Sequence, residues 1–202
     1  MLVVGFPAGP LEANCYLLAP ADGGECVIVD PGEDVFEPLE AALTAHGLTP
    51  VAMLATHGHP DHVASAAEIG ARRGIPLYLH EADRPLVAAD AGERKDGIVS
   101  LVEGPLRQAG LEITVSRTPG HTAGSVIFGL TSAEGGRIVL TGDSLFAGSI
   151  GRSSGDGDEL VRSLGTKVMT LPDDTVVLPG HGPATTIGQE RAGNPFLTGT
   201  GV

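Results

Sequence analysis

The sequence is poor in aromatic and basic residues. Its 202 residues include no tryptophan, two tyrosines and five phenylalanines, and 12 lysines and arginines stand against 25 aspartates and glutamates. The formal net charge of −13 disfavours a nucleic acid or an anionic membrane surface as the main partner, because such surfaces are bound through clusters of basic residues. We therefore expect neither partner, although an anionic small molecule drawn by a local metal stays compatible with this charge.

Long apolar runs and cysteine-rich motifs are also missing. No run approaches the roughly 18–20 residues that span a bilayer, and no signal-peptide pattern is visible at the N-terminus. The two cysteines, Cys15 and Cys26, lie in apolar strand-like runs and outside any Cys-x-x-Cys motif. This favours buried structural thiols in a reducing, cytoplasmic setting, with a disulfide or a reactive thiol as the alternative.

Glycine and proline, in contrast, are plentiful, with 30 and 15 residues, and imply many tight turns. The length predicts one domain over residues 1–202. Apolar runs predict strands over 14–19, 26–30, 51–55, 75–79, 111–118, 125–130, 137–141 and 175–178. Helices are predicted over 35–46, 63–73 and 158–170, while 81–110 looks polar and irregular and the tail from Gly188 has no clear period. This order indicates sheets covered by helices.

The most informative segment is Thr56-His-Gly-His-Pro-Asp-His62. Imidazoles and a carboxylate that converge on one point are the ligands of a divalent metal of borderline softness. Gly58 and Pro60 disfavour a helix through the cluster. Because the segment follows the apolar run 51–55, we expect its side chains on a loop at the end of a strand, where α/β folds place their chemistry.

Three further donors follow apolar runs and stand beside glycine, namely His121, Asp143 and His181. Each alone is more typical of a loop, and Asp143 alone is typical of a turn; Asp61 alone would suit a helix N-cap. Together with residues 57–62 they predict a metal centre. His46 and His80 lie outside such positions and are interpreted as surface or packing residues.

The order His-x-His-x-Asp-His, then His, Asp and a final His, resembles the metallo-β-lactamase superfamily over nearly the whole chain. Within it the sequence is most similar to the glyoxalase II group, the hydroxyacylglutathione hydrolases. The closer match is carried by Asn14-Cys-Tyr16, Val29-Asp-Pro-Gly32, Thr118-Pro-Gly-His-Thr122, Thr141-Gly-Asp-Ser-Leu-Phe146, Gly148-Ser-Ile-Gly-Arg152 and Leu178-Pro-Gly-His-Gly-Pro183. The resemblance implies an α/β (α+β) fold, an αββα sandwich of two mixed sheets flanked by helices.

The resemblance also implies a ligand set for two metal ions. The first would be bound by His57, His59 and His121, and the second by Asp61, His62 and His181, with Asp143 bridging both. Two zinc ions per chain are the expectation, and iron or manganese are alternatives because mixed nitrogen and oxygen sites discriminate poorly. Asp30 would orient a ligand or the bridging water from behind, or else simply form a turn.

Two departures from the glyoxalase II pattern bear on glutathione recognition rather than on metal binding. The C-terminal helical region of the full-length enzymes is not expected, since about twenty residues follow His181. Shorter relatives continue Gly-Arg with Thr-Asp, whereas Gly151-Arg152 is followed by Ser153-Ser154-Gly155. The thiol of the substrate and the oligomeric state therefore stay open.

By this resemblance the activity is hydrolysis of a small-molecule 2-hydroxyacyl thioester by a metal-bridging hydroxide. Asp61 would orient the nucleophile, and Arg152 would either neutralise an anionic end of the substrate or form a structural salt bridge. No strong general acid is needed, because a thiol has a pKa of about 8.5 and leaves as the thiolate.

Several rival functions share this pattern. A persulfide dioxygenase would hold one Fe(II) on His57, His121 and Asp143, and a lactonase would use all seven ligands. A β-lactamase is disfavoured because Asp143 stands where a cysteine is common. A diiron oxygen-reducing protein would need a flavin domain, and nucleic-acid-processing relatives need a basic surface. A non-catalytic metal-binding protein is the remaining alternative.

Overall fold

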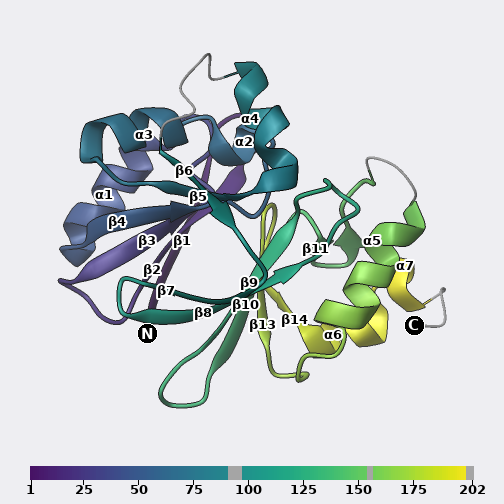
Figure 1. Cartoon of the computed structure of the whole chain (residues 1–202). Helices are drawn as coiled ribbons and strands as arrows, with labels where there is room; N and C mark the ends of the chain where they lie inside the picture. Colours follow the sequence, from purple (N-terminus) through teal and green to yellow (C-terminus); the bar gives the residue numbers. More distant parts are fainter. Residues whose placement is uncertain (91–96, 154–156, 199–202) are drawn as a thin grey trace.

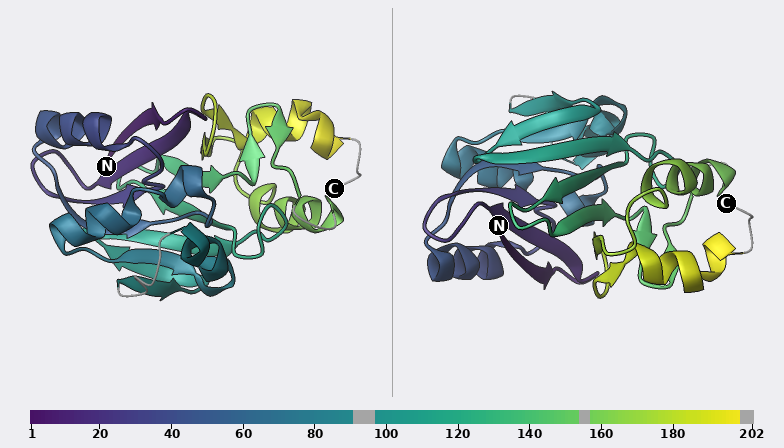
Figure 2. Two further views of the ribbon diagram at one scale, coloured as in Figure 1. Left: turned by 90° about the horizontal axis from the view of Figure 1, so that it is seen from above. Right: turned by 90° about the horizontal axis from the view of Figure 1, so that it is seen from below.

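Two six-stranded sheets face each other, and helices cover their outer faces, in the computed structural model (Figures 1 and 2). The structure describes residues 1–90, 97–153 and 157–198. The layers follow the order helix, sheet, sheet, helix, which confirms the αββα architecture predicted from the sequence. None of the helices in the described part of the chain combines the length and apolar character that a membrane crossing requires.

The first sheet has the order β1-β2-β3-β4-β5-β6. Strands β1 to β3 pair antiparallel, and β3 to β6 run parallel. Its strands are β1 (Leu2–Ala8), β2 (Ala13–Ala19), β3 (Glu25–Val29), β4 (Thr49–Leu54), β5 (Leu77–His80) and β6 (Ile98–Leu101). The chain segments that connect the parallel strands form α1 (Phe36–His46), α2 (Pro60–Val63), α3 (Ala66–Arg73), the 3-10 turn η1 (Glu81–Asp83) and α4 (Arg84–Asp90). Because β3 and β4 are parallel neighbours, the segments that follow them meet at one edge.

The second sheet has the order β14-β13-β10-β9-β8-β7. Only the β10–β13 pair is parallel among the described strands of this sheet, so the loops after β10 and β13 also emerge at one edge. Its strands are β7 (Gly104–Gln108), β8 (Leu111–Arg117), β9 (Val126–Thr131), β10 (Arg137–Gly142), β13 (Val176–Pro179) and β14 (Thr185–Thr186). A separate two-stranded sheet consists of β11 (Leu145–Phe146) and β12 (Ser149–Ile150). The outer layer is α5 (Gly157–Ser163), the π-helix η2 (Leu164–Val168), α6 (Ile187–Gly193) and α7 (Pro195–Thr198).

Alternation along the strands sorts the buried side chains into three cores. On β2, Leu17 packs toward the helices α1 and α3, while its neighbour Leu18 packs between the sheets. On β9, Phe128 joins the core between the sheets and Ile127 packs under the second helical layer. Each sheet is thus buried on both faces, which explains why its strands appear as nearly continuous apolar runs in the sequence.

Cys15 and Cys26 are buried on β2 and β3, and neither forms a disulfide. Burial raises the pKa of both thiols, that of Cys26 to about 11. The expectation of structural thiols is therefore confirmed, and the low thiolate character argues against a reactive cysteine.

Several predicted elements were wrong in type or extent. The stretch 81–110 is not irregular, because η1, α4, β6 and β7 lie in it; its residues 91–96 lie outside the described ones. The tail forms α6 and α7, the predicted helix 63–73 is divided into α2 and α3, and 158–170 forms α5 followed by a π-helix. Strand β1 escaped prediction since it is a partly exposed edge strand that contains Pro7.

Candidate metal centre

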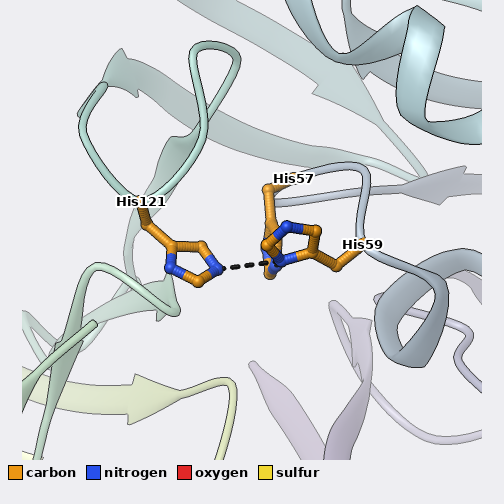
Figure 3. A group of neighbouring side chains, drawn as sticks. All are labelled: His57, His59 and His121. Atoms are coloured by element: carbon orange, nitrogen blue, oxygen red, sulfur yellow. Dashed lines mark hydrogen bonds between the residues drawn. The ribbon is translucent and has the colours of Figure 1, made fainter. Parts of the chain in front are cut away.

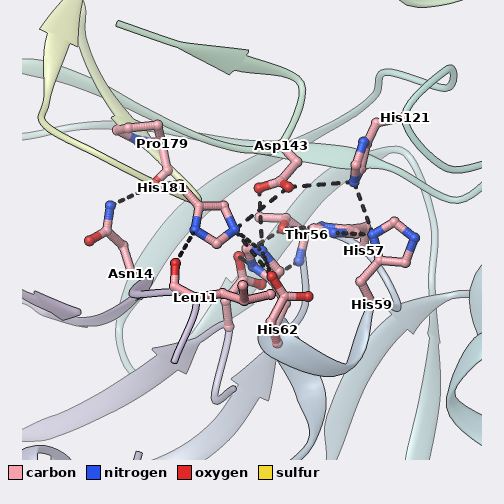
Figure 4. A network of polar contacts seen from close by, with 12 residues as sticks. Leu11, Asn14, Thr56, His57, His59, His62, His121, Asp143, Pro179 and His181 are labelled. Atoms are coloured by element: carbon pink, nitrogen blue, oxygen red, sulfur yellow. Dashed lines mark hydrogen bonds and ion pairs between the residues drawn. The ribbon is translucent and has the colours of Figure 1, made fainter. Parts of the chain in front are cut away.

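The loops at one edge of the two sheets bring all seven predicted ligands together. Figure 4 labels each of them except Asp61. One loop follows β4 and enters α2, and the others follow β8, β10 and β13. Their donor atoms form three overlapping groups, which are His57, His59 and His121; His57, His62 and Asp143; and Asp61, His62 and His181. His46 and His80, interpreted as bland from the sequence, belong to none of these groups: His46 pairs with Asp22, and His80 caps η1.

The first group consists of three imidazoles (Figure 3). His59 Nδ1 lies 3.1 Å from His57 Nε2 and 3.0 Å from His121 Nε2. The three rings are nearly perpendicular in pairs, with interplanar angles of 82° to 89°. Ring nitrogens that converge edge-on in this way are placed to share one cation rather than to stack.

The group of Asp61, His62 and His181 is the second half of the centre and combines a carboxylate with two imidazoles. His181 Nε2 lies 3.3 Å from His62 Nε2 and 3.1 Å from Asp61 Oδ2, and Asp61 Oδ2 lies 3.6 Å from His62 Nε2. Asp143 stands between this half and the first half, which consists of His57, His59 and His121. Its Oδ1 lies 3.3 Å from His62 Nε2, and its Oδ2 lies 3.5 Å from His121 Nε2. This is the position expected of a carboxylate shared by both halves.

One local expectation was wrong. The sequence disfavoured a helix through residues 57–62, yet α2 begins at Pro60 and includes Asp61 and His62. The proline occupies the first helical position, where its missing N–H costs nothing and its fixed φ suits the helix. His57 and His59 precede the helix, so the turn in the chain separates the donors of the two groups.

Hydrogen bonds on the outer side of the imidazoles fix which nitrogen faces the centre. His121 Nδ1 donates to the carbonyl of Arg152 at 2.8 Å, and His181 Nδ1 donates to the carbonyl of Leu11 at 3.0 Å. A carbonyl only accepts, so each Nδ1 carries the proton and each Nε2 presents a lone pair inward. Lone pairs held this close repel one another unless a cation lies between them.

A buried carboxylate oxygen gives a second test of the fit. Among the described residues, Asp143 Oδ1 is buried and has no hydrogen-bond partner. Buried anionic oxygens are rarely left unpaired, and this one faces His62 across the centre (Figure 4). Nitrogen lone pairs and an unpaired carboxylate oxygen directed at one point form a donor set that fits divalent metal ions.

The electrostatics agree with a site for positive charge. Burial and the neighbouring imidazoles lower the pKa values of His57 and His59, so both stay neutral and able to coordinate. Burial alone would lower the pKa of His62, but the neighbouring carboxylates of Asp143 and Asp30 outweigh it and raise that pKa to about 10.

The two carboxylates of the centre stay ionised. Burial opposes ionisation of Asp61 and Asp143, but contacts and charge from His181 and His62 lower both pKa values below the ordinary range.

Glycines permit the tight packing around Asp143. A Cβ on Gly180 would collide with Asp143 Oδ1, and a Cβ on Gly151 would collide with the Asp143 backbone carbonyl.

Asp30 lies directly behind His62. Its Oδ2 accepts from His62 Nδ1 at 3.1 Å, and its carboxylate also accepts from the backbone N–H and the hydroxyl of Thr56, both at 2.7 Å. These contacts hold the His62 ring against Asp30, and the orienting role of Asp30 stays a prediction. Arg152 contributes its backbone carbonyl to His121, while its side chain is exposed; the residues Ser154 and Gly155 beyond it lie outside the described ones.

Two residues escaped sequence reasoning. Asp83 is buried and accepts hydrogen bonds from the segments that carry His57, His59 and His121. Asn14 donates to the segment that carries His181. Asn14 belongs to a motif that was noted only because it resembles the family, and Asp83 lies in the stretch that was interpreted as irregular. The sequence therefore did not indicate that either residue contacts the loops of the metal centre.

Comparison with known proteins agrees with this geometry. Residues 8–181 match the family model of the metallo-beta-lactamase superfamily. The uncharacterized protein Rv2581c of Mycobacterium tuberculosis is 42% identical over 98% of this chain and 99% of its own length. The hydroxyacylglutathione hydrolase GloC of Haemophilus influenzae is 33% identical over 95% of each chain.

Solved structures of similar proteins cover almost the whole chain. BLEG-1, a B3 metallo-beta-lactamase, superposes with a TM-score of 0.84 at 36% identity over 98% of this chain and 100% of its own. TTHA1623, solved in a di-iron-bound form, gives 0.81 at 38% identity over 96% and 100%. ETHE1 from Myxococcus xanthus gives 0.82 at 25% identity over 98% and 85%. Fold, ligand order and the family match agree, and the chain belongs to the metallo-β-lactamase superfamily.

Proposed function

We propose that this protein is a binuclear, zinc-dependent hydrolase that cleaves a small-molecule 2-hydroxyacyl thioester, of the S-lactoylglutathione type. The observation that carries the proposal is a pair of donor groups that a third group, His57, His62 and Asp143, links, with imidazole lone pairs directed inward. The similarity to a hydroxyacylglutathione hydrolase over 95% of each chain supports the choice of thioester. Two zinc ions per chain are proposed, and the similarity to a protein solved with two iron ions keeps iron as the alternative metal.

The proposed ligands are His57, His59 and His121 in one half and Asp61, His62 and His181 in the other, with Asp143 between them. Divalent metal ions bound there would supply Lewis acidity and lower the pKa of a water molecule toward neutrality.

Other residues would steer the reaction. The ionised Asp61 carboxylate would accept a hydrogen bond from the attacking water and orient it toward the carbonyl carbon. Asp30 would keep the His62 ring in place through its hydrogen bond to Nδ1. Arg152 accepts from His121 through its backbone carbonyl, and its exposed side chain would neutralise an anionic end of the substrate. The thiolate would leave without a general acid.

A β-lactam is the second candidate substrate. The specific observation in its favour is the 36% identity to BLEG-1 over the whole of that chain. The chemistry of water attack on a carbonyl is shared, so substrate preference would be decided by the rim of the centre. Persulfide oxidation stays the alternative that the resemblance of the sequence implied.

Metal content and a substrate panel test the proposal together. The protein is purified without added metal, its metals are measured per chain, and it is assayed on hydroxyacyl thioesters, lactones, β-lactams and persulfides. We expect close to two zinc ions per chain and the highest kcat/KM on a thioester. About one iron per chain, with oxygen uptake on a persulfide, would overturn the proposal in favour of a dioxygenase.

A further inference from the structure

We propose that Asp83 and Asn14 are positioning residues, each of which holds the donor geometry of one half of the centre. This inference rests on the metal centre of the proposed function but not on its substrate. Neither side chain is placed among the donor groups. Both act through the backbone of the loops that carry the histidines.

Asp83 joins two loops that come from different sheets. Its Oδ2 accepts from the backbone N–H of Gly58, at 2.9 Å, and from the hydroxyl of Thr122, at 2.7 Å. Its Oδ1 accepts from the backbone N–H of Gly124 at 2.7 Å. Gly58 separates His57 from His59, and Thr122 directly follows His121. One carboxylate therefore ties together the segments of all three histidines of the first group.

The packing around Asp83 points to the same role. The residue is 1% exposed, and a buried carboxylate is costly unless its oxygens are paired. A Cβ on Gly124 would lie 2.5 Å from Asp83 Cγ, and one on Gly58 would lie 3.0 Å from Asp83 Cβ. Both loops approach Asp83 so closely that only glycine fits without a shift. The glycines of the two histidine motifs thus serve this contact.

Asn14 holds the other half from the opposite side. Its Nδ2 donates to the carbonyls of Pro179 and Gly182, at 3.0 and 2.9 Å, and these two residues flank the Gly180–His181 pair (Figure 4). The neighbouring Tyr16 hydroxyl donates to the same Pro179 carbonyl at 2.8 Å. The hairpin between β1 and β2 also supplies the Leu11 carbonyl that fixes His181 Nδ1.

The two contacts are separate, so they predict separate effects. Asp83→Asn keeps the volume but places an N–H group against at least one of the three donors, which breaks the junction between the loops. Asn14→Ala removes both donors to the His181 segment. Mutation of a residue that orients a metal ligand typically lowers the metal affinity about 10–100-fold. Each substitution should act on one half of the centre alone.

The test measures Co²⁺ binding to metal-free protein by its visible absorption, in two backgrounds. His181→Ala disables the second half, and His59→Ala disables the first. In the His181→Ala background we expect Asp83→Asn to weaken Co²⁺ binding about 10–100-fold and Asn14→Ala to leave it unchanged. In the His59→Ala background we expect Asn14→Ala to weaken Co²⁺ binding about 10–100-fold and Asp83→Asn to leave it unchanged. Asp174→Asn, an exposed carboxylate paired with Arg137, is the matched control.

Equal weakening in both backgrounds, or none in either, would overturn the proposal, since a general loss of structure predicts the former. If Asp83→Asn does not fold, Thr122→Val removes one of the three hydrogen bonds and should cause a smaller loss in the same background. Failure of the wild type to bind Co²⁺ would overturn both proposals. Two bound metals without thioester turnover would reject the proposed substrate and leave the positioning roles standing.

Discussion

Asp61 has two proposed roles, as a metal ligand and as the hydrogen-bond acceptor that orients the attacking water. Both can be tested by a substitution that leaves the fold intact. The side chain of Asp61 is 17% exposed and its carboxylate lies against His181 and His62, outside the apolar cores, so its truncation leaves no cavity in a core. It lies 3.1 Å from His181 Nε2 and stays ionised. Removal of this carboxylate would take one donor from the second half and one hydrogen-bond acceptor from the attacking water.

We predict that Asp61→Ala abolishes most thioester hydrolysis without unfolding the protein. The expected fall in kcat/KM is about 100-fold or more, the size typical of a lost proton acceptor. Steady-state kinetics in excess metal, alongside circular dichroism, would measure it. Asp22→Ala, an exposed carboxylate that pairs with His46, is the control and should keep full activity. Near-wild-type turnover of a metal-loaded Asp61→Ala variant would contradict this role.

At this scale the donors were readable from the sequence, whereas the residues that hold them were not. Histidine and aspartate beside glycine at the ends of apolar runs stand out because such positions rarely serve a core. Asp83 has no comparable signature, since its three hydrogen-bond donors come from loops 25 to 41 residues away. Only the folded chain shows that these loops meet.

At the scale of helices, the C-terminal ends of the longer helices α1 and α3 were predicted correctly, whereas several short helices were not predicted at all. The predicted helices 35–46 and 63–73 end where α1 and α3 end, and the glycines that follow, Gly47 and Gly74, adopt the left-handed conformation at the C-terminal cap. Short elements such as α4 and α6 have seven residues each, too few for a helical period to emerge. Their formation depends on packing against the sheets, which a local pattern does not encode.

Gly74 offers a test of the capping argument. Its φ is 68°, and a Cβ there would meet nothing within 4 Å, so the cost of Gly74→Ala is conformational alone. We expect a loss of about 1–2 kcal/mol in the free energy of unfolding, measured by urea denaturation. Gly193→Ala is the matched control, because it also has open space but no left-handed backbone; it should be neutral or slightly stabilising. Equal effects of both substitutions would refute the capping explanation.

At the scale of the whole molecule, the centre exists only when both sheets are in place. Its donors come from loops after β4 in the first sheet and after β8, β10 and β13 in the second. The backbone N–H of Val126 donates to the Thr56 carbonyl at 2.8 Å and so joins the two sheets directly beside His57. The predicted layer order could be read from the alternation of strand runs and helices, but the strand pairing that aligns these loops could not.

This arrangement predicts that bound metal stabilises the entire fold. A metal that binds the folded chain alone adds about 4 kcal/mol when its free concentration is 1,000 times its Kd. For a chain of this size such a difference corresponds to roughly 8–16 °C in Tm. Removal of the metal should lower Tm by that amount and leave the far-ultraviolet circular dichroism of the folded state unchanged, because the outer hydrogen bonds of His121 and His181 persist. Calorimetry before and after dialysis against a chelator measures the shift, with the calcium-loaded chelator as control. A metal-depleted protein that melts at the original temperature would contradict this prediction, because it would mean that the metal does not bind the folded chain in preference to the unfolded one.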